Sequence, residues 1–228
     1  QESGFFAGIA AALETKSGKV AVVNGIAYPS NVNYQYGFMS GVNYAKAKYD
    51  AKAEYVEIPS YAGTDVTNKN VGGNYIGNFS DEATGKVVGK ALLDKGVDIM
   101  LVAAGGSGNG VFTAVKEAGN AQVIGCDVDQ YDDGANGDKN IILTSVLKVM
   151  HSNVEKQLEK VLDGSFKGEN ALLGADTNST GYVSADGRQQ LSAETLEKLE
   201  DAYKKVQSGE IVPAANFNMT PDDFTGLK

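Results

Sequence analysis

Residues 97–130 read VDIMLVAAGGSGNGVFTAVKEAGNAQVIGCDVDQ, in which two apolar runs flank a glycine-rich turn and a short amphipathic segment. The first run covers residues 97–104, the turn residues 105–110, the amphipathic segment residues 111–118 and the second run residues 123–130. Both runs are too short to span a membrane, so the pattern predicts a strand–loop–helix–strand unit with adjacent parallel strands. Units of this kind bind ligands at the carboxyl ends of their strands.

The residues at this predicted edge offer hydrogen-bond donors and acceptors together. Glycines in the turn allow close approach of a ligand to backbone amides at a helix start, and two aspartates follow the second run. A lysine stands at the exit of a later strand, on the same edge. Because paired carboxylates repel a bare phosphate, we expect a neutral polyhydroxylated or heterocyclic ligand. The candidate ligand-binding residues are Gly105, Gly106, Ser107, Gly108, Asn109, Asp127, Asp129 and Lys148.

The rest of the chain alternates between strand and helix patterns. Strands are expected at residues 19–24, 55–58 and 141–145, and helices at residues 34–49, 149–161 and 192–207. A further helix is expected to begin near residue 80, with Asn78 or Ser80 as its N-cap, and to stop at Gly96. This order predicts an α/β fold with a Rossmann-like, doubly wound parallel sheet.

Residues 4–13 are apolar nearly all round, which is typical of a helix packed between other elements. Nothing precedes this helix to cover it, so we expect a chain that starts in the middle of a larger fold. Either a second copy of the chain, in a homodimer, covers the helix or the chain is marginally stable.

Composition narrows the classes of partner. The 228 residues carry a net charge of −9, without a cluster of lysine and arginine, which argues against a nucleic-acid partner. The single cysteine, Cys126, lies in an apolar strand and is expected to be a buried, inert thiol. Residues 1–13 lack a signal-peptide pattern, so we expect a soluble chain whose targeting segment has been removed or never existed.

Enzyme and metal motifs are incomplete. The glycine turn does not give G-x-G-x-x-G in register, and no P-loop motif is present. Residues 105–109 nearly match the hydrolase motif G-x-S-x-G, but Asn109 occupies the last position and only His151 could act as a base. The acidic residues 127–133 break the EF-hand pattern. We therefore expect no catalytic residues, no bound metal and no cofactor.

Five segments in this order, residues 79–86, 96–99, 103–112, 123–130 and 143–148, resemble the basic membrane protein family. These are the PnrA-like nucleoside-binding lipoproteins of bacterial ABC importers. The run AAGGSGNGV with a downstream GCDVDQ carries most of the resemblance. It implies a type I periplasmic-binding-protein fold, in which two α/β lobes close on a ligand. Family members have a further N-terminal part of the first lobe, with the acylated cysteine, that this sequence lacks.

The resemblance also implies an organisation and a role. Residues 19–150 would form the ligand-binding C-terminal lobe, and residues 1–18 and 151–228 would belong or return to the other lobe. The chain would be the substrate-binding protein of an ABC importer, would bind a purine nucleoside and would meet an ABC permease. The full-length protein would be extracytoplasmic and lipid-anchored.

Individual residues can be matched to family roles. Gly106 would approach the ligand through its backbone, Asp127 would accept from a ribose hydroxyl or a base N–H, and Lys148 would donate to ribose. Leu101 and Val102 stand where a family member can carry an aromatic residue that stacks on the purine.

Two alternatives of other classes stay open. One is an enzyme on a Rossmann-like fold that acts on a nucleoside or sugar with Asp127 as its base, which turnover of a bound nucleoside would reveal. The other is a sensory ligand-binding domain of the same fold, which a permease encoded beside the gene would argue against.

Overall fold

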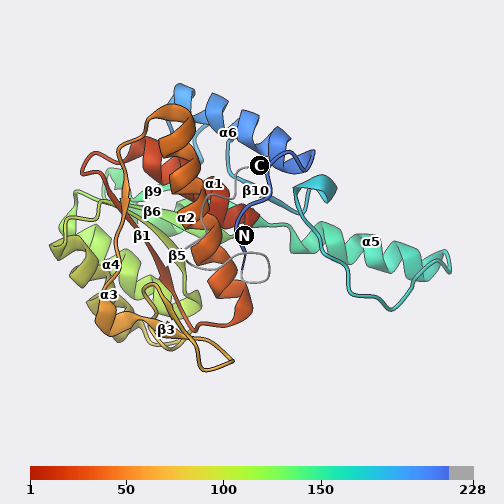
Figure 1. The fold of residues 1–228 in the computed structure, drawn as a ribbon, viewed down its shortest axis with the longest axis horizontal. Coiled ribbons are helices and arrows are strands. Elements are labelled where there is room, and N and C mark those ends of the chain that lie inside the picture. Colours follow the sequence, from red (N-terminus) through yellow and green to blue (C-terminus); the bar gives the residue numbers. More distant parts are fainter. Residues whose placement is uncertain (216–228) are drawn as a thin grey trace.

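The computed structural model describes residues 1–215, which fold around a six-stranded sheet with helices on both faces (Figure 1). The strands follow the order β10-β9-β6-β5-β1-β2, and all neighbouring pairs are parallel except β10 with β9. The sheet consists of β1 (Lys19–Asn24), β2 (Glu54–Tyr55), β5 (Ile99–Ala103), β6 (Gln122–Asp127), β9 (Ile142–Lys148) and β10 (Thr180–Tyr182). Separate hairpins are formed by β3 (Gly63–Thr64) with β4 (Asn70–Gly72) and by β7 (Ala135–Asn136) with β8 (Lys139–Asn140). The helices are α1 (Glu2–Glu14), α2 (Pro29–Tyr49), α3 (Glu82–Asp94), α4 (Gly108–Ala118), α5 (Met150–Leu162) and α6 (Ala193–Gln207).

The order of the parallel strands confirms the predicted doubly wound sheet. From β1 the chain passes through α2 to β2 on one side, and then through α3 to β5 on the other side. The winding direction therefore reverses between β1 and β5. In open parallel sheets, a ligand crevice forms at such a reversal, outside the carboxyl ends of the strands.

The strands are buried on both faces, which explains their continuous apolar runs. In β1, Val20 and Val22 pack with α1, α2 and α6, whereas Ala21 and Val23 pack with α3 and α4. Successive side chains of a strand point to opposite faces, so each strand contributes to two separate cores.

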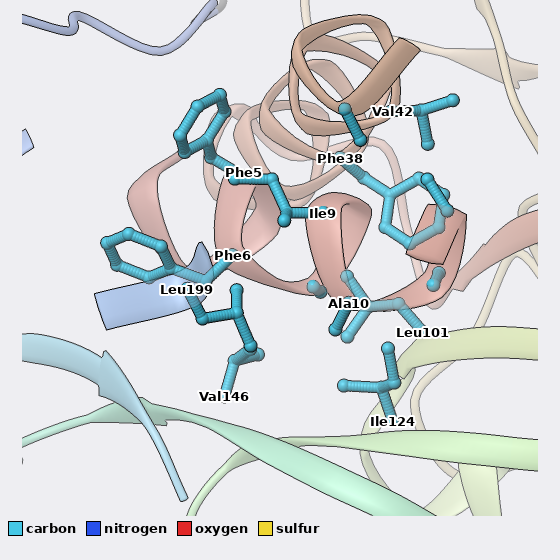
Figure 2. Packing of buried hydrophobic residues seen from close by; sticks show 14 of the residues in the cluster. Phe5, Phe6, Ile9, Ala10, Phe38, Val42, Leu101, Ile124, Val146 and Leu199 are labelled. Atoms are coloured by element: carbon cyan, nitrogen blue, oxygen red, sulfur yellow. The ribbon is translucent and has the colours of Figure 1, made fainter. Parts of the chain in front are cut away.

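Helix α1 lies at the centre of one of these cores. Phe5, Phe6 and Ile9 are fully buried, and in Figure 2 α1 lies between α2 and the strands. The expectation that this helix lacks cover is therefore wrong: α2, the sheet and α6 cover it within the same chain. The argument for a homodimer that rested on an uncovered helix does not hold.

Glycines allow α1 and α2 to approach backbone to backbone. A Cβ at Gly4 would lie 2.4 Å from the carbonyl oxygen of Tyr34, and one at Gly8 would lie 2.1 Å from that of Phe38. A Cβ at Gly41 of α2 would lie 2.1 Å from the carbonyl oxygen of Phe5. Since ordinary carbon–oxygen contacts are about 3.3 Å or longer, only glycine fits at these positions. This contact fixes the position of α2 on the sheet.

Some predicted element boundaries shift. Helix α2 begins at Pro29, five residues ahead of the prediction, because proline favours the first helical position. The N-cap of α3 is Asp81, whose side chain accepts a hydrogen bond from the Thr84 amide, and neither Ser80 nor Asn78 caps it. The strand predicted at residues 55–58 is reduced to Glu54–Tyr55.

Helix α5 differs from the other helices because it has no buried residue. It projects away from the sheet and its covering helices (Figure 1). Its apolar side chains Met150, Val154, Leu158 and Val161 recur at helical spacing and are each about half exposed. Among residues 1–215, no helix has the length and apolar character needed to cross a membrane.

The sequence assigned residues 1–18 and 151–228 to a lobe other than that of residues 19–150. Helices α1 and α6 pack on a sheet whose strands come from residues 19–150 and, for β10, from residues 180–182, whereas α5 projects away from it. The assignment of residues 1–18 and 151–228 to another lobe stays a prediction. Its last part, residues 216–228, lies outside the described residues.

Candidate ligand-binding site

A cavity of about 460 Å³ lies where the carboxyl ends of β5, β6 and β9 meet the first turns of α2, which follows β1, at the reversal of the strand order. This volume is in the range of small-molecule sites. Six of the eight predicted site residues line it: Gly105, Gly106, Gly108, Asn109, Asp127 and Lys148. A larger depression, of about 630 Å³, lies beside the amino ends of β5 and β6 and contains none of the predicted residues.

Asp127, the last residue of β6, lines the cavity and accepts hydrogen bonds with both of its carboxylate oxygens. The Tyr34 hydroxyl donates to its Oδ1 at 2.8 Å, and Lys148 Nζ donates to its Oδ2 at 3.1 Å. The backbone of Asp127 has φ of 70°, in the left-handed region that residues with a side chain seldom adopt. Strained backbone of this kind collects at ligand sites.

Lys148 is the last residue of β9, so the parallel pairing of β6 and β9 brings it beside Asp127. Its side chain is 51% exposed and that of Asp127 is 39% exposed, so both groups remain accessible to a ligand. An ion pair with this exposure contributes about 0–1 kcal/mol to stability. The pair therefore offers a carboxylate acceptor beside an ammonium donor. A ligand that separates Lys148 from Asp127 would reduce the stability of the fold only slightly.

The glycine-rich turn has two separate tasks. Gly105 has φ of 55°, and a Cβ at Gly105 or at Gly106 would lie 3.2 Å from the carbonyl oxygen of Phe79. Because both residues are glycines, only backbone atoms of these two residues line the cavity. Gly110, by contrast, packs α4 against α3: a Cβ there would lie 1.9 Å from the carbonyl oxygen of Glu82. Part of the glycine pattern is thus explained by helix packing and not by a ligand.

Two predicted residues do not line the cavity. Ser107 is fully buried, and its hydroxyl donates to the Asn78 carbonyl and accepts from the Asp81 amide, which ties α4 to the start of α3. Asp129 accepts from Arg188 Nε at 2.7 Å and from the Tyr131 amide. Burial alone would raise the pKa of Asp129, but these hydrogen bonds and the Arg188 charge hold it below its usual value.

Several cavity residues were not among the predicted site residues, and three of them are Asn31, Tyr34 and Phe79. Asn31 and Tyr34 lie in the first turns of α2, after the exit of β1, and Phe79 lies before α3. The side-chain amide of Asn31 donates from Nδ2 to the Ala103 carbonyl oxygen at 2.9 Å. The ring centroids of Phe79 and Tyr28 lie 6.1 Å apart. Asn31 and Tyr34 follow a strand at which the winding order reverses. Because ligands bind at such reversals, this position could have identified both residues from the sequence.

The cavity also contains an aromatic wall. Of the two residues expected at the stacking position, Val102 lines the cavity, whereas Leu101 packs in the core on the opposite face of the sheet. Phe79 and Phe112 supply aromatic surface to the same cavity. An apolar ligand face can therefore still find aromatic contacts.

The environments of Cys126 and His151 bear on whether the cavity holds a reactive side chain. Burial, together with the Asp127 charge, raises the pKa of the Cys126 thiol to about 12, so the thiol lacks nucleophilic character at neutral pH. His151 lies on the projecting helix α5 and does not line the cavity. Within residues 1–215, no group of three or more His, Cys, Asp or Glu side chains is placed to hold a metal ion.

Comparison with known proteins gives concordant matches. A 31% identical relative over 229 residues is basic membrane protein D of Borreliella burgdorferi, with 98% of this chain and 59% of that protein covered. The "ABC transporter nucleoside-binding protein BmpA" of Lactococcus lactis is 31% identical over 179 residues, which cover 73% of this chain and 45% of that protein. The chain thus spans about half the length of the curated relatives it matches.

Solved structures support the same fold. An ABC transporter solute-binding protein from Aeropyrum pernix K1 superimposes with a TM-score of 0.74 at 23% identity, covering 98% of this chain and 66% of that one. The family profile described as "ABC transporter substrate-binding protein PnrA-like" matches residues 1–61 and 57–216. The chain therefore belongs to the PnrA-like family of ABC transporter substrate-binding proteins, also called the basic membrane protein family.

Proposed function

We propose that the chain binds a purine nucleoside, or a similar small polar molecule, in the 460 Å³ cavity. The observation that carries the proposal is the Asp127–Lys148 pair beside the aromatic side chains Phe79 and Phe112. A carboxylate acceptor next to an ammonium donor suits neighbouring hydroxyl groups of a sugar, and the aromatic surface suits a heterocycle. The lactococcal relative is named a nucleoside-binding protein, which supports this choice.

The eight site residues differ in the role that we propose for them. Gly105, Gly106, Gly108 and Asn109 would form the wall that the ligand approaches, and Asp127 and Lys148 would bind its hydroxyl groups. Ser107 would hold this wall in place through its hydrogen bonds to the Asn78 carbonyl and the Asp81 amide. Asp129 would hold the loop after β6 through Arg188 instead of contacting the ligand.

We further propose that the cavity forms one side of an interlobe cleft. The apolar face of α5 supports this, because a stripe of half-exposed apolar side chains on an otherwise unpacked helix marks a surface that another structure covers. In this proposal the cover is a second lobe, and closure of the two lobes holds the ligand. The partner would be an ABC permease, and the whole protein would be extracytoplasmic and lipid-anchored.

Calorimetric titration of the 228-residue chain with inosine, guanosine, adenosine and ribose tests the proposed function. Saturable binding of a nucleoside that exceeds binding of ribose is the expected result, because in this proposal Phe79 and Phe112 would contact the base and not the sugar. Asp127→Asn serves as the matched control, since it removes the charge and keeps the shape of the side chain. Absence of binding by all four compounds, or equal binding by wild type and Asp127→Asn, would contradict the proposal. Release of free base during incubation would instead favour an enzyme.

A further inference from the structure

We propose that Tyr34 is a positioning residue of the ligand site, which holds the Asp127 carboxylate so that Oδ2 is presented to a ligand hydroxyl. This inference rests on the proposed function, because the orientation of Asp127 matters for binding only where a ligand contacts that carboxylate. The sequence places Tyr34 only at the start of a helix expected at residues 34–49, whereas in the structure its hydroxyl donates to Asp127.

The two oxygens of Asp127 have partners of different character. Oδ1 accepts from the Tyr34 hydroxyl at 2.8 Å and, more weakly, from Cys126 Sγ at 3.4 Å. Oδ2 accepts from Lys148 Nζ at 3.1 Å, and the Lys148 side chain is half exposed. A lysine ammonium on a flexible stem can turn toward a ligand, whereas a tyrosine ring packed against a core cannot move in this way.

Tyr34 is well fixed at its other end. Its ring packs against the core cluster of α1, α2 and α6, and its carbonyl oxygen lies against Gly4 of α1 at the close helix crossing. Burial raises the pKa of the Tyr34 phenol far above its usual value, so the hydroxyl keeps its proton and stays a donor at neutral pH. Tyr34 thus links the packed α1–α2 pair to Oδ1 of Asp127, a residue that lies 93 positions later in the sequence.

The backbone of Asp127 supports a positional role. With φ of 70°, this position would suit glycine better than a residue with a side chain. The carboxylate adds contacts to Tyr34, Lys148 and Cys126 that glycine could not make. A carboxylate without a fixed partner rotates freely, because the terminal torsion of aspartate is broad.

The first test compares two ligands that differ in the sugar hydroxyls. Calorimetric titrations with inosine and with 2′,3′-dideoxyinosine would be made on wild type, Tyr34→Phe, Asp127→Asn and the double variant. We expect Tyr34→Phe to weaken inosine binding about tenfold, as for loss of a hydrogen bond to a charged group, and dideoxyinosine binding less than twofold. In the Asp127→Asn background, Tyr34→Phe should change inosine binding less than twofold, because its effect passes through Asp127.

Tyr55→Phe is the matched control. The Tyr55 hydroxyl is buried and has no hydrogen-bond partner among the described residues, and Tyr55 lies on β2 outside the cavity. This variant should bind both ligands as wild type does. If Tyr34→Phe weakens both ligands equally, or if its effect persists undiminished in Asp127→Asn, Tyr34 has a general packing role and the proposal is overturned.

A measurement without ligand separates this proposal from the proposed function. A tyrosine hydroxyl that donates to a carboxylate exchanges slowly, so we expect a downfield proton resonance in the NMR spectrum of the unliganded chain. The resonance should be lost in Tyr34→Phe, shifted in Asp127→Asn and retained in Tyr55→Phe. Its presence without binding of any nucleoside would reject the proposed function and keep the Tyr34–Asp127 link. Its absence would overturn the positioning role even where nucleosides bind.

Discussion

Replacement of Gly8 by alanine is expected to destabilise the fold, because α1 and α2 touch through their backbones at this point. The added Cβ would lie 2.1 Å from the carbonyl oxygen of Phe38 and 3.0 Å from the Val42 amide nitrogen. Since a normal contact needs about 3.3 Å, the two helices would have to separate by about 1 Å. Phe5, Ile9 and Phe38, all fully buried, would lose contacts as a result.

The magnitude follows from two opposing effects. Overpacking of a core costs about 1–3 kcal/mol, and the upper end applies here because the obstacle is a backbone carbonyl that no rotamer change can move. Alanine regains about 0.5–1 kcal/mol because it lowers the backbone entropy that folding removes. The net loss of unfolding free energy is therefore about 2 kcal/mol, or a decrease in Tm of about 4–8 °C for a chain of this length.

Urea unfolding followed by far-ultraviolet circular dichroism measures this loss. Gly89→Ala in α3 is the matched control, because its Cβ would lie 3.2 Å from Val111 Cα and 3.3 Å from the Ala114 side chain, which is a mild overlap. Gly89→Ala should lie within about 1 kcal/mol of wild type. If Gly8→Ala is as stable as wild type, or more stable than Gly89→Ala, the backbone contact between α1 and α2 is not as described.

Three further outcomes are expected. Asp127→Asn should weaken nucleoside binding at least tenfold in calorimetry, with a Tm close to that of wild type because asparagine tolerates the left-handed conformation; unchanged affinity would count against the site. Leu158→Glu on α5 should reduce any self-association of the isolated chain in analytical ultracentrifugation and leave its Tm unchanged, because Leu158 is exposed; a lower Tm would mean that α5 packs on this lobe. Arg188→Ala should lower stability above about pH 4, and the difference from wild type should shrink as the pH falls through the lowered pKa of Asp129; a constant difference from pH 2 to 7 would refute that link.

Much of the fold could be predicted from local patterns. The apolar runs gave the positions of β1, β5, β6 and β9, because strands of a doubly covered parallel sheet are apolar on both faces. The amphipathic spacing of α5 predicted a helix correctly. The same spacing did not reveal that its apolar face is uncovered, since periodicity specifies a face and not the element that covers it.

The candidate site could be predicted in part. Asp127 and Lys148 end parallel strands, so their place at one edge followed from the strand pattern alone. The sequence could not show that Ser107 and Asp129, unlike Asp127 and Lys148, do not line the cavity. Their hydrogen-bond partners Asn78 and Arg188 lie 29 and 59 residues away in the sequence. Tyr34 was missed as a site residue for the same reason. The sequence placed it in a helix at residues 34–49, and only the packing of α2 brings its hydroxyl to Asp127.

The central claim is that the cavity at the carboxyl ends of β5, β6 and β9, beside the first turns of α2, is the ligand site. Titration of the ¹⁵N-labelled chain with inosine, followed by two-dimensional NMR, tests it most directly. We predict that the amide signals of Gly105, Gly106, Asp127 and Lys148 shift together along one saturable curve. Shifts confined to the depression around residues 136–140, or no shifts at any inosine concentration, would contradict the account.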